Sequence, residues 1–76
     1  MKLFIKTYCP WCDYAETWLK KNDYDYEVID VRKDPAAFQE MQRISGQTSA
    51  PVLQLEDGRV LADFGPEELG PFLKED

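Results

Sequence analysis

Within its first 31 residues the chain changes its hydrophobic period twice, and no other feature constrains the fold more. Residues 2–7 form a β-rich apolar run, and the apolar residues after it recur at helical spacing, which predicts a helix over residues 10–21. Pro10 suits the first turn of that helix because its missing N–H would have no partner there. Residues 24–31 then alternate apolar and charged side chains, as a strand does. A strand, a helix and a strand in this order predict a right-handed crossover between two parallel strands.

A second helix is marked by its sequence at both ends. Asp34 is a favoured N-cap residue, and Pro35 directly after it fits the first helical position. Apolar residues at helical spacing continue as far as Ile44. Gly46 is predicted to end the helix, because glycine readily adopts the left-handed conformation that closes helices.

The last third of the chain predicts two more strands and a third helix. Residues 51–56 and 59–62 are predicted as short strands on either side of an Asp-Gly dipeptide (residues 57–58), which is typical of tight antiparallel hairpins. The last helix is predicted to begin at Pro66. Gly70 weakens that helix by about 1 kcal/mol relative to alanine.

These elements account for the whole chain. We expect a single α/β domain over residues 1–76, with the order β-α-β-α-β-β-α, a four-stranded mixed sheet and three helices.

Charge and composition exclude several classes of function. The 15 acidic residues outnumber the 9 basic ones, so the net charge is −6. That charge repels phosphate backbones and anionic lipids, so we expect no nucleic-acid or membrane partner. The chain has no histidine, which excludes catalytic pairs and metal sites that need one. No apolar run approaches the roughly 20 residues of a spanning helix or suits a signal peptide, so we expect a cytoplasmic protein.

The two cysteines, Cys9 and Cys12, lie where the first strand passes into the first helix. Cys9 falls at the helix N-cap, where unpaired N–H groups and the positive end of the helix dipole favour the thiolate form. Cys12 should lie deeper, yet close enough to attack a mixed disulfide on Cys9. The pattern favours redox catalysis over its alternatives, a carried metal or a structural disulfide, in a compartment that keeps thiols reduced. A disulfide closing so short a loop would add only about 2 kcal/mol.

Two segments resemble the glutaredoxin family. KTYCPWC (residues 6–12) is similar to the family's active site, and SGQTSAPV (residues 45–52) is similar to its segment ending in Thr-Val-Pro. The resemblance covers nearly the whole chain and implies the thioredoxin fold and thiol–disulfide oxidoreductase activity. It also implies a cis peptide bond before Pro51, with Cys9 as the nucleophile and Cys12 as the resolving thiol.

The same resemblance implies that glutathione is a co-substrate and that no cofactor is tightly bound. In the family, glutathione is held by the lysine before the motif, a polar residue at the end of the second helix, the backbone before the proline, aromatic walls and an aspartate after the hairpin. The matching residues here are Lys6, Tyr8, Trp11, Gln47 (with Arg43 as its alternative), Ala50, Pro51 and Asp63.

The segment after the hairpin departs from the family pattern. Residues 61–67 (LADFGPE) lack the usual Gly-Gly pair, and the order Phe, Gly, Pro, Glu is similar to redoxins that thioredoxin reductase reduces and that feed ribonucleotide reductase. One alternative is therefore a donor coupled to a flavoprotein reductase. A carrier of metal or an iron–sulfur cluster is another, although a proline after the first cysteine generally goes with no cluster in this family. The expected partners are glutathione and disulfide-containing proteins, and the expected state is a monomer.

Overall fold

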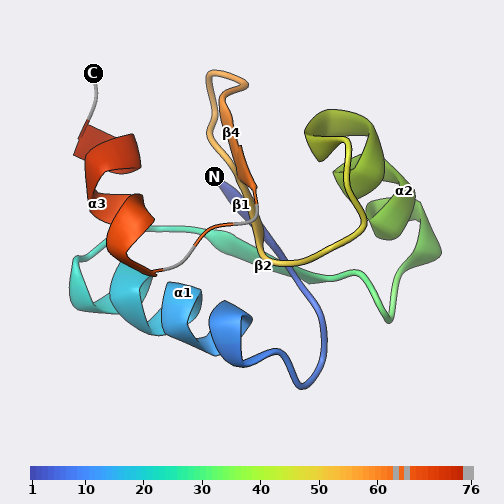
Figure 1. Cartoon of the computed structure of the whole chain (residues 1–76), viewed down its shortest axis with the longest axis horizontal. Coiled ribbons are helices and arrows are strands. Elements are labelled where there is room, and N and C mark those ends of the chain that lie inside the picture. The colour runs from blue at the N-terminus through green and yellow to red at the C-terminus, as the bar shows by residue number, and fades with distance from the viewer. Residues whose placement is uncertain (63, 65, 75–76) are drawn as a thin grey trace.

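The computed structural model describes residues 1–62, 64 and 66–74, in which one four-stranded sheet lies between helices (Figure 1). The strand order is β2-β1-β3-β4; β1 pairs with β2 in parallel and with β3 antiparallel, and β3 and β4 form an antiparallel pair. This arrangement confirms the predicted element order and mixed sheet. The elements are β1 (Lys2–Ile5), α1 (Pro10–Lys21), β2 (Glu27–Asp30), α2 (Pro35–Ser45), β3 (Val52–Gln54), β4 (Val60–Ala62) and α3 (Pro66–Lys74).

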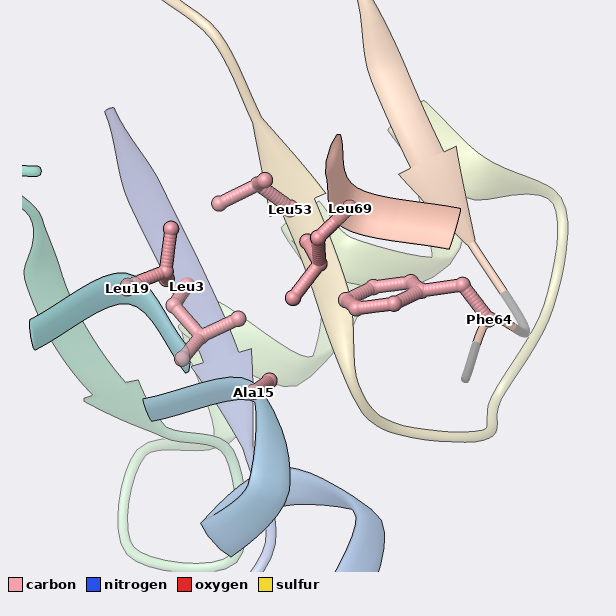
Figure 2. Close-up of a cluster of buried hydrophobic side chains, with 6 residues drawn as sticks. All are labelled: Leu3, Ala15, Leu19, Leu53, Phe64 and Leu69. Atoms are coloured by element: carbon pink, nitrogen blue, oxygen red, sulfur yellow. The ribbon is translucent and has the colours of Figure 1, made fainter. Parts of the chain in front are cut away.

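Helices cover both faces of the sheet, with α1 and α3 on one face and α2 on the other (Figure 1). Successive residues of a strand point to opposite faces, so β1 supplies Leu3 to one core and Phe4 to the other. The neighbouring strand β3 repeats the division, because Leu53 pairs with Leu3 and Val52 pairs with Phe4. Figure 2 shows the core under α1 and α3, formed by Leu3, Ala15, Leu19, Leu53, Phe64 and Leu69. The core under α2 consists of Phe4, Val31, Ala37, Met41 and Val52.

The second strand begins later than its alternating pattern predicts. β2 starts at Glu27, whose N–H donates to the carbonyl of Met1, whereas the sequence predicted a start at Tyr24. Tyr24 instead closes α1, since its N–H donates to the carbonyl of Leu19 and its ring stacks on Trp18 at 5.8 Å. Trp18 is half-buried at the margin of the core under α1 and α3.

The other strands are also shorter than predicted, because the paired residues are Lys2–Ile5 in β1, Val52–Gln54 in β3 and Val60–Ala62 in β4. The predicted hairpin is present, with β3 and β4 joined by a tight turn. Gly58 donates its N–H to the carbonyl of Leu55 at 3.1 Å and has a φ of 95°. That left-handed backbone is unfavourable for residues with a Cβ, so the Asp-Gly dipeptide places its glycine where the turn requires one.

Both predicted ends of α2 are confirmed. The Asp34 carboxylate accepts from the N–H groups of Ala36 and Ala37 at 3.1 and 3.3 Å. At the other end Gly46 has a φ of 74° and donates its N–H to the carbonyl of Gln42. These caps fix the point at which the chain leaves α2 and turns toward β3.

Pro71 lies inside α3 and weakens it. It has no N–H to donate to the carbonyl of Glu67, as a residue four positions on would in an uninterrupted helix. The residue before a proline also disfavours helical backbone, because its Cβ meets the proline ring. Gly70 has no Cβ, which explains a glycine at a position where alanine would otherwise favour the helix.

We expect Pro71→Ala to raise the free energy of unfolding by about 2 kcal/mol, because it restores a backbone hydrogen bond of α3. The Pro71 side chain is exposed, so its removal costs no core packing. Gly70→Ala should bring little gain while Pro71 is present, although a Cβ there would make only an ordinary 3.6 Å contact with Trp18. Urea unfolding of the two single variants and the double variant measures both effects. A stabilising Gly70→Ala beside a neutral Pro71→Ala would contradict this account of α3.

Candidate active site

Cys9 is the N-cap residue of α1, in extended backbone at a φ of −105°. Its sulfur accepts the N–H of Cys12 at 3.3 Å. The other N–H groups at the start of the helix and the positive end of its dipole face the same region. The Cys9 sulfur therefore faces hydrogen-bond donors of the backbone at the open end of the helix. Cys9 is half-buried and is not in a disulfide, so its sulfur can react with a partner molecule.

A second segment, 41 residues away in sequence, meets this helix end. The Cys9 sulfur lies 4.0 Å from the carbonyl oxygen of Ala50, toward which the thiol form can donate. The Ala50–Pro51 peptide bond is cis, as the family resemblance implies. Pro51 is buried and directly precedes β3, so it removes no hydrogen bond from the sheet. The backbone before Pro51 is thereby placed beside the reactive sulfur.

Cys12 occupies a different environment from Cys9, one turn further along α1. Its side chain is 1% exposed. Burial raises the pKa of the Cys12 thiol to about 12, and the neighbouring Cys9 sulfur adds to the increase, whereas a backbone hydrogen bond with Lys6 opposes it. At neutral pH Cys12 is therefore a neutral thiol. The two cysteines of one motif are distinguished by position, one at the open helix end and the other inside.

The raised pKa of Cys12 predicts a stability that depends on pH. The folded protein favours the neutral thiol, so this contribution is complete below the ordinary pKa of 9.0 and is lost as the pH rises toward 12. We expect the free energy of unfolding to fall by up to about 1.4 kcal/mol per pH unit in that range.

The measurement compares Cys9→Ser with Cys9→Ser/Cys12→Ala, which excludes disulfides and titration of Cys9. Burial, the largest cause of the shift, remains in the first variant. The difference in unfolding free energy between the two should shrink from about pH 8 to about pH 11. A difference that does not change with pH would show that burial of Cys12 does not raise its pKa.

The loop between β1 and α1 is fixed by a contact that sequence reasoning missed. The Thr7 hydroxyl donates to the Asp30 carboxylate at 2.6 Å, and this bond is the main cause that lowers the pKa of Asp30. Thr7 follows β1 and Asp30 ends β2. Polar residues at the carboxyl ends of two parallel strands lie side by side, and this was the signal available in the sequence.

The residues that the resemblance implied for glutathione are only partly gathered by the structure. Lys6 extends toward α2, where its ammonium lies 6.0 Å from the centroid of the Phe38 ring. Gln47 follows α2, and its side-chain nitrogen is buried with no hydrogen-bond partner. Tyr8 and Trp11 are exposed beside Cys9.

Two further residues complete that set. Arg43, the alternative to Gln47, is an exposed residue in the last turn of α2. Asp63 lies outside the described residues.

The part of the chain that the structure describes has neither a metal-binding cluster nor a membrane-spanning helix. No group of three or more cysteine or acidic side chains is arranged there to hold a metal ion. None of the helices there combines the length and apolar character needed to cross a membrane.

A sequence model of the Glutaredoxin family matches residues 1–60, which include both cysteines and the segment before Pro51. The chain belongs to the glutaredoxin family. A glutaredoxin-like 8.6 kDa protein of Clostridium pasteurianum, encoded in a rubredoxin operon and described as uncharacterized, is 27% identical over 97% of each chain.

Solved structures confirm the thioredoxin fold expected for this glutaredoxin-family chain. A variant of the thioredoxin-like protein BC3987 superposes with a TM-score of 0.87, at 33% identity over 96% of this chain and 97% of that one. A glutaredoxin from Archaeoglobus fulgidus superposes with a TM-score of 0.83 over 96% of this chain and 84% of that one. Its identity of 23% supports the fold alone.

Proposed function

We propose that this protein is a glutathione-dependent dithiol–disulfide oxidoreductase that reduces protein disulfides and glutathione mixed disulfides. The observation that carries this proposal is the contrast between its cysteines. Cys9 has its sulfur at an open helix N-terminus, and Cys12 is a buried neutral thiol one turn away. A half-buried nucleophile at an open helix end, with a second thiol buried one turn away, suits dithiol exchange.

In the proposed reaction the Cys9 thiolate attacks one sulfur of the substrate disulfide. The substrate S–S bond breaks, a mixed disulfide forms on Cys9, and the departing sulfur takes up a proton. Cys12 then loses its proton and attacks the Cys9 sulfur, which releases the second substrate thiol and leaves a Cys9–Cys12 disulfide. Two molecules of glutathione return the two electrons and become glutathione disulfide.

The backbone and Gln47 support glutathione as the reductant. A buried donor without a partner costs about 1–3 kcal/mol, and the side-chain nitrogen of Gln47 is such a donor. Because this nitrogen is shielded from solvent, the Gln47 side chain has to turn outward to donate it to a carboxylate of glutathione. The Ala50 backbone beside Cys9 would pair with the extended tripeptide, and Lys6 would supply positive charge.

One observation favours a second candidate, a redoxin reduced by a flavoprotein such as thioredoxin reductase. Glu67 and Glu68 are both exposed in the first turn of α3, directly after the segment where glutaredoxins bind the γ-glutamyl end of glutathione. Their carboxylates, in a chain of net charge −6, would repel an anionic tripeptide. A protein reductase does not have to bind at that position.

The decisive experiment follows NADPH consumption with a small glutathione mixed disulfide as substrate. With glutathione and glutathione reductase present, turnover that Cys9→Ser loses would support the glutathione-dependent enzyme. No turnover by a protein that still reduces insulin when thioredoxin reductase is supplied would overturn it in favour of the second candidate. Loss of both reactions would overturn dithiol exchange itself.

A further inference from the structure

Large apolar side chains are exposed around Cys9 to a degree that the fold does not explain. Among the described residues, four large hydrophobic side chains are exposed, and three of them lie within residues 8–14: Tyr8 (98% exposed), Trp11 (55%) and Tyr14 (59%). We call these three the aromatic surface. Aromatic residues exposed together around a reactive sulfur are typical of a surface that binds another molecule.

The conformation of Tyr8 supports a binding role. Its φ of 64° lies in the left-handed region, which is rare for a bulky residue and costs of order 1 kcal/mol or more. The conformation places the ring in solvent and not against the core, so packing does not offset the cost. Neighbouring Thr7 is held by its bond to Asp30, which fixes the direction in which the loop presents Tyr8.

Trp11 and Tyr14 form a pair on α1. Their ring centroids are 6.0 Å apart, with the planes tilted by 54°. Both positions lie in the first half of the helix, where the acidic residue of the first turn is Asp13. The basic residues of α1, Lys20 and Lys21, are in its last turn. The exposed faces of these two rings are electron-rich and can bind a cationic group.

Charge determines the kind of partner that suits this surface. The net charge of −6 disfavours a second copy of this chain and an acidic protein, and it attracts basic ones. Arginine and lysine side chains bind aromatic faces through their cationic groups and pack their methylene stems on the rings.

We propose that the aromatic surface binds an arginine- or lysine-bearing segment next to the disulfide of a protein substrate. This inference rests on the proposed dithiol exchange and adds its substrate class. Trp11 and Tyr14 hold the cationic side chain while the neighbouring substrate cysteine lies at Cys9. Selectivity among disulfides then depends on the charge beside the cysteine as well as on the disulfide itself.

The test uses the fully reduced protein and a set of disulfide-cyclised peptides that differ only beside one cysteine, where they carry arginine, glutamine or glutamate. A single turnover, followed by chromatography of the reduced peptide, needs neither glutathione nor a reductase. We expect the arginine peptide to react about five-fold faster than the glutamine peptide and the glutamate peptide to be slowest. High salt should reduce the advantage of arginine.

Three variants locate the effect. Tyr14→Ala should bring the ratio of the arginine and glutamine rates close to one, whereas Tyr14→Phe, which keeps the aromatic face, should preserve it. Val28→Ala serves as a matched control, because Val28 is the fourth exposed hydrophobic residue and lies on β2. It should also preserve the ratio.

The outcomes separate this inference from the proposed function. If the glutamine peptide is reduced and arginine brings no advantage, or if Tyr14→Ala keeps the advantage, the substrate class is wrong and dithiol exchange stands. If no peptide is reduced, both proposals fail.

Discussion

Cys9→Ser is expected to lower the rate of disulfide reduction by at least about a thousand-fold with every substrate. A serine hydroxyl is not ionised at neutral pH and does not form the mixed disulfide through which exchange proceeds. The buried Cys12 does not replace it, because burial keeps its thiol neutral and its sulfur out of reach of a protein disulfide.

The same substitution should leave the fold intact, which makes the loss of activity interpretable. The Cys9 sulfur accepts the N–H of Cys12 at the start of α1. Serine is among the best N-cap residues, so its hydroxyl should accept the same N–H and keep or slightly increase the free energy of unfolding. The measurement is insulin reduction beside a urea unfolding curve of the same sample. Disulfide reduction by a folded Cys9→Ser protein would show that Cys9 is not the nucleophile.

Helix ends that are marked by nearby capping residues were predictable from the sequence. Asp34 and Gly46 define the two ends of α2 because each makes its capping contact within a few residues. The position of Cys9 at the N-cap of α1 followed in the same way, since a strand pattern, a proline and a helix pattern meet there. The role of Pro51 required the family resemblance, because nothing local to that residue indicates what its backbone will face.

Contacts between distant residues were not predictable in this way. The alternation at residues 24–31 is a valid strand pattern, yet stacking of Tyr24 on Trp18 uses the first part of it to pack against α1. The hydrogen bond from Thr7 to Asp30 spans 23 residues and depends on the parallel register of β1 and β2. The exposure of Tyr14 was equally hidden, because helical spacing alone does not tell which aromatic residues of α1 are covered by α3.

Replacement of Cys12 should separate two reactions that Cys9→Ser abolishes together. Glutathione mixed disulfides need only Cys9, since a second glutathione can release the product, so Cys12→Ala should retain most of this turnover. Intramolecular protein disulfides need Cys12 to release the substrate, so their reduction should be lost and a mixed disulfide on Cys9 should accumulate. Intact-mass spectrometry would detect that adduct as the sum of the two chains.

The matched variant Cys12→Ser separates the effect of burial at this position on stability from the effect of the missing thiol on activity. It should show the same split in activity, but it places a hydroxyl at a position that is 1% exposed, which should cost about 1–3 kcal/mol if the hydroxyl finds no partner. Cys12→Ala avoids that cost and leaves only a small cavity. Survival of both reactions in either variant would show that Cys12 does not resolve the mixed disulfide. If both variants lose only the reduction of protein disulfides and Cys12→Ser is the less stable of the two, then Cys12 resolves the mixed disulfide from a position that is buried in the folded protein.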